Sequence, residues 1–390
     1  ISSFERKAQT SWDSVATSID AEIKPFLLQP IDQPTGKLIQ ILGLLCHMFH
    51  MLLQRSSHAD NTGNVFRAGT HSTFLAAAIQ QWNKMNADMY GFVYPERFTN
   101  LLSVATALRL GKVKLQASGL ATFINDRVEE GPAPKARQIL TPAVFASYKP
   151  FEKQDFNVRA FYKRIFRMPT FNDLYYADMG NSKLNPEYVT QYDAGFAYTK
   201  TWENYLFYRF KIQADGYYNK VKDKIIAYPK GQQFRWTMLN LGKVEIKGID
   251  VSTETTVNPV KDLFVTLRVQ YTYQKAQDFT DPSDTYYGDQ IPYIPWHSGS
   301  AIAQASFKGW NLNYSFIYVG ERYNQQENIK YNYTQPWYTS DISLSKDLKF
   351  KFGLIKAAVE VNNLLSQDYD VILNYPMPKR NYKVSLTIEI

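Results

Sequence analysis

The sequence has few of the residues that build cross-linked or metal-binding proteins. Its 390 residues include one cysteine, Cys46, and five histidines. One cysteine excludes an intrachain disulfide framework and a cysteine-based zinc site. His47 and His50 lie three residues apart beside Cys46, but nothing nearby supplies the remaining ligands of a zinc or haem site. We therefore expect no metal site and no bound cofactor.

The chain also lacks long apolar or basic runs. Its longest apolar stretch, residues 38–53, contains Gln40 and Gly43 and is short for a membrane-spanning helix, so a buried or interfacial helix fits it better. The net charge is +8, but lysine and arginine are scattered singly, which argues against a nucleic-acid partner. No nucleophile elbow, phosphate loop or carboxylate pair stands out, so the sequence does not indicate an enzyme.

The beginning of the chain differs from the rest. Residues 1–7 lack the apolar core of a signal peptide, so a leader has been removed or the chain starts within a longer protein. Residues 1–70 share no pattern with the remainder of the sequence. We expect them to be an atypical segment, helical or disordered, and residues 71–390 to form a separate unit.

From about residue 70 onward, apolar and polar residues alternate in segments of ten to fifteen residues. Period-two alternation predicts a strand with one apolar and one polar face, and this length suits a tilted strand that crosses a membrane. The clearest strand is 262–274, where one face carries Leu263, Val265, Leu267, Val269, Tyr271 and Tyr273. Other strands are expected at 98–110, 113–124, 139–148, 156–166, 188–199, 205–220 and 244–256. Roughly fourteen strands can be counted.

Two of these strands have special features. Residues 379–390 alternate up to the last residue of the sequence, with Tyr382, Val384, Leu386 and Ile388 on one face, which is typical of a closing barrel strand. Within 244–256 the alternation changes phase at Gly248, which predicts a β-bulge there.

The connections between the strands alternate in length. Short ones are expected at 111–112, 200–204, 308–309 and 348–349, and long ones at 126–138, 167–187, 276–295, 321–335 and 366–379. Outer-membrane barrels sort short turns and long loops to opposite sides of the bilayer, whereas a soluble sandwich has no reason to do so. The aromatic fraction of 15% with a mean hydropathy of −0.37 agrees with aromatic girdles and a polar lumen. We therefore predict an all-β fold, a transmembrane antiparallel β-barrel in contact with outer-membrane lipid.

Several motifs point to one family. The segment Arg167-Met-Pro-Thr-Phe-Asn-Asp-Leu-Tyr175 is followed by Gly180-Asn-Ser-Lys-Leu-Asn-Pro-Glu187 and Tyr192-Asp-Ala-Gly195. Near the end stand Val359-Glu-Val-Asn-Asn-Leu-Leu365 and Tyr375-Pro-Met-Pro-Lys-Arg-Asn-Tyr382. This set of motifs resembles those of the TonB-dependent outer-membrane receptors, in particular the Bacteroides-type cobalamin and iron-chelate branch.

The resemblance implies active, TonB-dependent uptake of a scarce nutrient complex: cobalamin, a siderophore or a haem-like ligand. Family barrels have about 22 strands and a plug domain through which the TonB complex acts. The chain is expected to supply the C-terminal part of such a barrel, without the plug and so in a truncated form. Two alternatives remain open. A passive porin or barrel enzyme of about fourteen strands would conduct ions or carry a catalytic group in its lumen, and a soluble β-rich adhesin would need no detergent.

The loop at 167–187 is the predicted site. Ligand contacts are expected from Arg167, Tyr175, Tyr176 and Asn181, because aromatic rings bury much area at a low entropic cost. The other motif residues are expected to shape the loop, since proline and glycine fix backbone angles and asparagine bonds to nearby backbone. They are Pro169, Thr170, Phe171, Asn172, Leu174, Gly180, Leu184, Pro186 and Glu187.

Overall fold

The computed structural model describes residues 71–86, 92–131, 133–176, 179–202, 206–229, 236–351 and 353–389. The predicted helix at 38–53, with Cys46, His47 and His50, lies outside these ranges. No helix in the described part of the chain is long and apolar enough to cross a bilayer.

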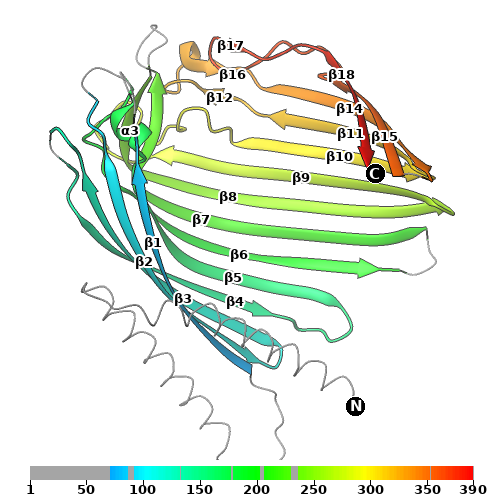
Figure 1. Ribbon diagram of the computed structural model, residues 1–390, viewed down its shortest axis with the longest axis horizontal. Helices are drawn as coiled ribbons and strands as arrows, with labels where there is room; N and C mark the ends of the chain where they lie inside the picture. Colours follow the sequence, from blue (N-terminus) through cyan, green and yellow to red (C-terminus); the bar gives the residue numbers. More distant parts are fainter. Residues whose placement is uncertain are drawn as a thin grey trace, which may run out of the picture.

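The main element is one sheet of fourteen strands, in which each strand pairs antiparallel with the next strand of the sheet along the chain (Figure 1). This confirms the predicted all-β antiparallel fold and the strand count. The strands are β1 (His71–Lys84), β2 (Glu96–Leu110), β3 (Val113–Arg127), β4 (Arg137–Tyr148), β5 (Asp155–Arg167), β6 (Glu187–Thr201), β7 (Phe207–Pro229), β8 (Trp236–Val260), β9 (Leu263–Asp278), β10 (His297–Phe307), β11 (Trp310–Val319), β14 (Trp337–Phe350), β15 (Gly353–Asn362) and β18 (Asn381–Glu389).

Smaller elements lie in the long connections. They are the helix α3 (Phe171–Tyr175), the 3-10 turn η1 (Lys330–Asn332), and the two-stranded pairs β12 (Arg322–Tyr323) with β13 (Tyr333–Thr334) and β16 (Asp370–Ile372) with β17 (Tyr375–Pro376). All of them gather at one end of the sheet (Figure 1).

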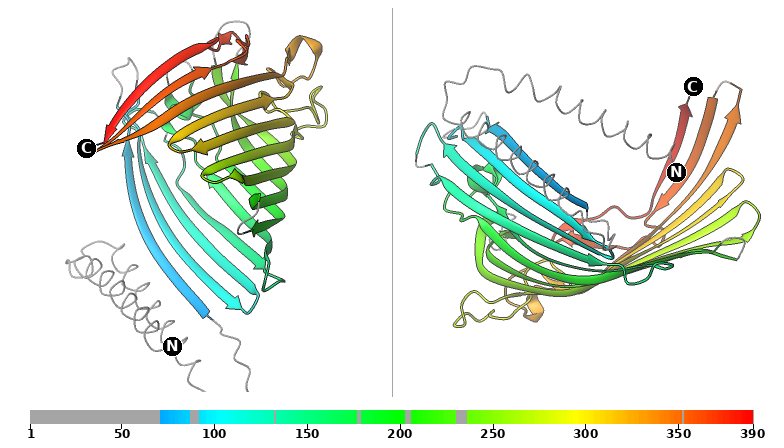
Figure 2. Two further views of the ribbon diagram at one scale, coloured as in Figure 1. Left: turned by 90° about the vertical axis from the view of Figure 1, so that its right-hand side faces the viewer. Right: turned by 90° about the horizontal axis from the view of Figure 1, so that it is seen from below.

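The sheet curves into a trough (Figure 2). Among the described residues, β1 pairs only with β2 and β18 only with β15, so these two strands are its edges. The curvature and the antiparallel order are those of a barrel wall.

The two faces of the wall differ in polarity. One face carries cross-strand ion pairs, including Arg159 with Asp215 at 2.5 Å and Arg268 with Glu254 at 2.6 Å. The opposite face is apolar, and on β9 Leu267 is 46% exposed. A second packed layer would have buried this row, so the apolar face meets lipid and the polar face lines the lumen.

The connections are sorted as predicted. Gly111–Lys112 and Lys308–Gly309 join strands at one end, while 168–186, 279–296, 320–336 and 363–380 cross over at the other. The two-residue turns use left-handed backbone at Gly111, Lys308 and Gly309, which closes a hairpin tightly. The end with long connections is the extracellular one.

Three details of the prediction are wrong. Lys247, Gly248 and Ile249 pair in unbroken register with β7, so there is no bulge at Gly248. The phase changes because Val244 and Ile246 pack in a core beyond the bilayer, whereas the apolar side of the strand from Ile249 onward faces lipid.

The other two corrections concern lengths. β7 and β8 reach Pro229 and begin at Trp236, well past the predicted limits near 220 and 244, because these extensions stand outside the lipid and need no strict alternation. The turn expected at 348–349 comes later, since β14 runs to Phe350.

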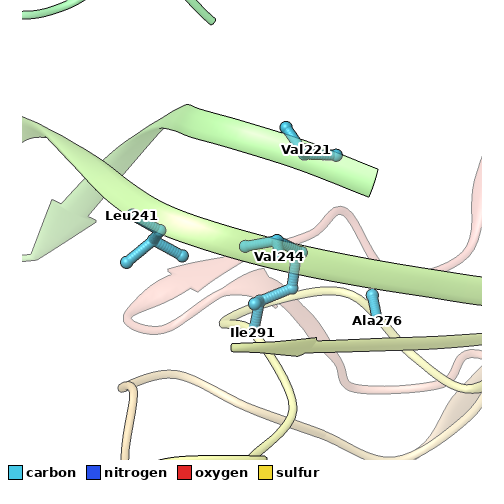
Figure 3. Close-up of a cluster of buried hydrophobic side chains, with 5 residues drawn as sticks. All are labelled: Val221, Leu241, Val244, Ala276 and Ile291. Carbon is cyan, nitrogen blue, oxygen red and sulfur yellow. The ribbon is translucent and has the colours of Figure 1, made fainter. Parts of the chain in front are cut away.

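A buried apolar cluster closes the extracellular end of the wall. Val221, Leu241, Val244 and Ala276 come from β7, β8 and β9, and Ile291 comes from the long connection after β9. Figure 3 shows Ile291 directed at Val244. The connection is thereby folded onto the luminal face, with Val244 0% and Ile291 2% exposed.

Candidate functional site

The loop recognised in the sequence is tightly built. Thr170 caps α3: its hydroxyl accepts from the Asp173 amide at 3.1 Å, and the Asp173 carboxylate accepts from the Thr170 amide at 2.9 Å. This capping box stabilises a helix of a single turn. Leu174 is 3% exposed and packs with Leu184 and Ile225.

The same loop is fixed to the wall by an arginine. Arg97 on β2 forms a bidentate pair with Asp126 on β3, both bonds at 2.7 Å, and also donates to the Pro169 carbonyl at 2.8 Å. Its guanidinium lies 5.0 Å from the centre of the Phe171 ring. Pro169 is fully buried. The motif is therefore anchored at its start to two strands far away in sequence.

Asn181 connects the loop to β8. Its amide nitrogen donates to the Met238 carbonyl at 3.0 Å and its amide oxygen accepts from the Lys183 backbone at 3.0 Å. The Met238 amide donates to the Met179 carbonyl at 3.1 Å. The loop thus supports the extended tip of β7 and β8.

The predicted contact residues are spread over this loop. Tyr176 is 50% exposed and the Arg167 side chain 49% exposed, with a 3.5 Å ion pair from Arg167 to Asp173. Tyr175 packs against the Leu174 cluster. A side chain at Gly180 would lie 2.6 Å from the Tyr176 nitrogen, so only glycine fits there. Glu187 is buried, and its carboxylate accepts from the Ile225 amide at 3.0 Å.

A larger site lies beside this loop, at the extracellular rim. It is a pocket of 960 Å³ built from five separate parts of the chain. Its lining residues are Tyr228, Trp236, Tyr286, Tyr293, Asn324, Gln325, Gln326, Glu327, Ile329, Tyr331, Asn332, Tyr333, Leu373, Asn374 and Tyr375. Aromatic rings and carboxamides dominate this rim pocket. Glu327 carries the one formal charge among its described lining residues.

Hydrogen bonds between the connections hold the rim pocket open. The Asn328 amide nitrogen donates to the Gln290 carbonyl at 3.0 Å, and the Gln290 amide donates back to the Asn328 side chain at 2.7 Å. Thr285 donates to the Glu327 carboxylate at 2.9 Å. These bonds join the β9–β10 connection to the β11–β14 connection.

Arg322 links a further connection to the two that are already joined. It is 2% exposed, and its guanidinium donates to the carbonyls of Gln335 at 3.2 Å, Asp370 at 2.6 Å and Val371 at 3.4 Å. Burial lowers the pKa of this guanidinium, but arginine stays protonated at physiological pH. The β11–β14 connection is therefore tied to the β16–β17 hairpin, which carries Tyr375.

Three phenols of the rim pocket, those of Tyr228, Tyr286 and Tyr293, hold their protons more tightly than a free phenol does. Burial raises the pKa of Tyr228 and of Tyr293 above the ordinary value, and the pKa of Tyr286 is raised by burial and by a hydrogen bond to Asp284. Trp236 and Tyr293 lie with ring centres 6.1 Å apart. The site offers flat rings together with neutral donors and acceptors, which suit a large ligand with polar edges.

Sequence reasoning missed this pocket. Its residues come from positions up to about 150 apart in the chain and follow no periodicity. The available signal was the concentration of tyrosine in the long connections, at Tyr286, Tyr287, Tyr331, Tyr333 and Tyr375. Within the ranges that the structure describes, no group of three His, Cys, Asp or Glu side chains is placed to hold a metal ion.

The comparisons with known proteins agree with this architecture. Residues 49–364 match the family model described as TonB dependent receptor-like, beta-barrel. The chain belongs to this TonB-dependent receptor family. Its barrel wall is accordingly an outer-membrane structure, and the resemblance seen in the sequence motifs is confirmed. Members of the family are receptors and transporters.

Curated relatives include the vitamin B12 transporter BtuB of Photobacterium profundum, 26% identical over 231 residues, which are 57% of this chain and 33% of the relative. BtuB of Vibrio vulnificus (strain CMCP6) is 24% identical over 81% of this chain and 47% of its own length. The chain thus spans between a third and a half of the length of these relatives.

Solved structures show the same fold. The copper transporter OprC has a TM-score of 0.61 at 12% identity, covering 81% of this chain and 53% of its own. BauA, the ferric preacinetobactin receptor from Acinetobacter baumannii, has a TM-score of 0.57 at 17% identity, covering 76% of this chain and 43% of its own.

Proposed function

We propose that the chain forms the extracellular pocket and barrel wall of an outer-membrane receptor for the active uptake of a large nutrient complex. The observation that carries this is the rim pocket, which lies above the luminal face and is assembled by connections that bond to one another. Energised uptake also requires a plug domain that engages TonB, and the described residues supply the wall and not that domain.

The chemistry of the rim pocket favours one class of ligand. A polyanionic ferric chelate would be matched by lysine or arginine. Among the described lining residues the charge is instead a single carboxylate, Glu327, set among five carboxamides and seven aromatic rings. A neutral or cationic chelate with amide groups on its rim, such as a cobalamin, complements these groups better. The curated vitamin B12 transporters among the relatives support the same choice.

The motif loop has a supporting part in this proposal. Asn181 and Met179 bond to Met238, two residues beyond Trp236. We propose that exposed Arg167 and Tyr176 meet the ligand as it enters, and that Tyr175 and Asn181 fix the β7–β8 tip.

Equilibrium dialysis of the full chain in detergent micelles tests the proposal. Cyanocobalamin should bind, and ferric citrate should bind at least about tenfold more weakly. Trp236→Ala should weaken cyanocobalamin binding by roughly tenfold, as for a buried aromatic contact. The matched control is Tyr148→Ala. Tyr148 is exposed on the apolar face, at the end of β4 that lies away from the rim pocket. Tighter binding of ferric citrate would overturn the ligand class.

A further inference from the structure

The lipid-facing side of strands β5 to β9 carries an unusual band of charge. On β9 the apolar row runs from Leu263 to Tyr273 and is followed on the same face by Lys275. Eleven residues suffice for one tilted crossing of the hydrocarbon. On β8 the row from Val257 to Ile249 is likewise followed by Lys247. The cations therefore begin where the strands leave the lipid core on the extracellular side.

An aromatic row marks the same level. Tyr162, Tyr192 and Tyr218 are register partners on β5, β6 and β7. Their ring centres are 5.3 Å and 6.3 Å apart, and the second pair is stacked. Lys247 lies 5.3 Å from the centre of the Tyr218 ring. Amphipathic rings settle at headgroup depth, so this row places the adjoining cations among lipid headgroups.

Above the row lies a shallow groove on the outer face. It has a volume of 660 Å³, and its lining includes Arg164, Lys220, Lys222 and Lys243 together with Tyr188 and Thr190. These residues come from four neighbouring strands at positions of matching register: Arg164 is two residues from the partner of Tyr192, and Lys222 pairs with both Tyr188 and Lys243. The groove is thus a feature of the assembled wall.

The protein neutralises only part of the charge of this band. Glu245 pairs with Lys243 at 3.0 Å and Lys247 at 3.6 Å. In the portion of the chain that the structure describes, Arg164, Lys220 and Lys222 form no ion pair with a carboxylate, and all three are exposed. Three cations without a carboxylate partner share one groove at headgroup depth. An anion located at the same depth in the membrane would neutralise them.

We propose that this groove binds the phosphates of an outer-leaflet lipid. A soluble anion would need only the cations. A lipid also explains why the cations stand next to an apolar row on the same face, because acyl chains would lie along Tyr162 and Val158 while phosphates reach Arg164, Lys220 and Lys222. The site is on the opposite face from the rim pocket, so it does not depend on which nutrient is carried.

The test compares two lipids with the same acyl chains. The full chain in dodecyl maltoside micelles is dialysed against bis-phosphorylated lipid A or against the dephosphorylated form, and bound lipid is counted. The phosphorylated lipid should bind at least about tenfold more tightly, and its binding should weaken as salt rises, since exposed charges are screened. Equal binding of the two lipids would refute the site, and this comparison needs no variant.

A triple variant locates the site. Arg164→Gln, Lys220→Gln and Lys222→Gln together should weaken binding of the phosphorylated lipid by roughly tenfold to a hundredfold. The control is Lys163→Gln, Arg209→Gln and Lys211→Gln, which removes the same charge from the luminal face of the same two strands and should leave binding unchanged. An equal loss in the control contradicts the proposal, as does displacement of the lipid by excess inorganic phosphate.

Discussion

The guanidinium of Arg322 donates to the main-chain carbonyl of Asp370 at 2.6 Å, across 48 residues of sequence. This bond joins two extracellular connections that each contribute side chains to the rim pocket. The arginine is buried and its partners are all carbonyls. It therefore links the two connections to each other and does not serve as a contact for an anion.

Replacing this arginine should loosen the pocket. Arg322→Gln replaces a guanidinium with five N–H donors by a shorter amide with two, so buried carbonyls lose their donors. The substitution should lower the free energy of unfolding by roughly 2 to 4 kcal/mol and weaken cyanocobalamin binding. Chemical denaturation and dialysis measure the two effects. Lys330→Gln, at an exposed position of the η1 turn, is the control. Unchanged stability in Arg322→Gln would show that the connections hold together without it.

Gly248 should tolerate no side chain. A β-carbon there would lie 2.5 Å from the Tyr217 ring and 2.5 Å from the Tyr273 carbonyl, so Gly248→Ala should destabilise the wall by roughly 2 kcal/mol or more. Gly216→Ala is the matched control on the neighbouring strand, because its nearest atom would be 3.9 Å away. Refolding yield into lipid vesicles distinguishes them. Equal yields would mean that Tyr217 moves aside freely.

The motif loop should act on binding through β8. Asn181→Asp removes the donor to the Met238 carbonyl and places a carboxylate against that oxygen. We expect cyanocobalamin binding to fall about fivefold to tenfold, with the barrel still folded as judged by circular dichroism. Ser182→Ala, at an exposed neighbour, should have no effect. An intact affinity in Asn181→Asp would separate the loop from the pocket.

The rim pocket should lose stability and bind its ligand more weakly at alkaline pH. Burial raises the pKa of Tyr228 and Tyr293, so each phenol holds its proton more tightly in the folded protein than in the unfolded chain. Their contribution to stability is fully present below the ordinary phenol pKa of about 10 and is lost as pH rises through the raised values. Tyrosinate absorbance and dialysis across this range measure the loss.

The matched variants for this titration are Tyr228→Phe and Tyr293→Phe. Each should remove one late step from the absorbance curve. Should both phenols instead ionise together with free tyrosine while binding persists, burial would not be what holds their protons.

The sequence predicted the barrel wall well, but it did not predict the rim pocket. The residues from Leu263 to Tyr273 have to alternate because lipid lies on one side and the lumen on the other. This strand could therefore be predicted from the sequence. The tips of β7 and β8 were not predicted, because Tyr228 and Trp236 stand outside the lipid, where no alternation of apolar and polar residues is imposed. The phase change at Gly248 marks that boundary.

The rim pocket escaped prediction for a related reason. The motif around Asn181 is conspicuous because turns demand particular residues, and those residues bond to the backbone. The rim pocket depends on Trp236, Tyr293 and Tyr375, which meet only after three long connections have packed together. No local pattern in the sequence encodes that meeting.

The most direct measurement is quenching of tryptophan fluorescence by cyanocobalamin, which absorbs in the emission range. The chain has seven tryptophans, and Trp236 lines the rim pocket. Titration of the full chain should give saturable quenching, and Trp236→Phe should lose that saturable component while the remaining tryptophans still report a folded protein. Identical saturable quenching in Trp236→Phe, or none in the native chain, would contradict the assignment of the pocket.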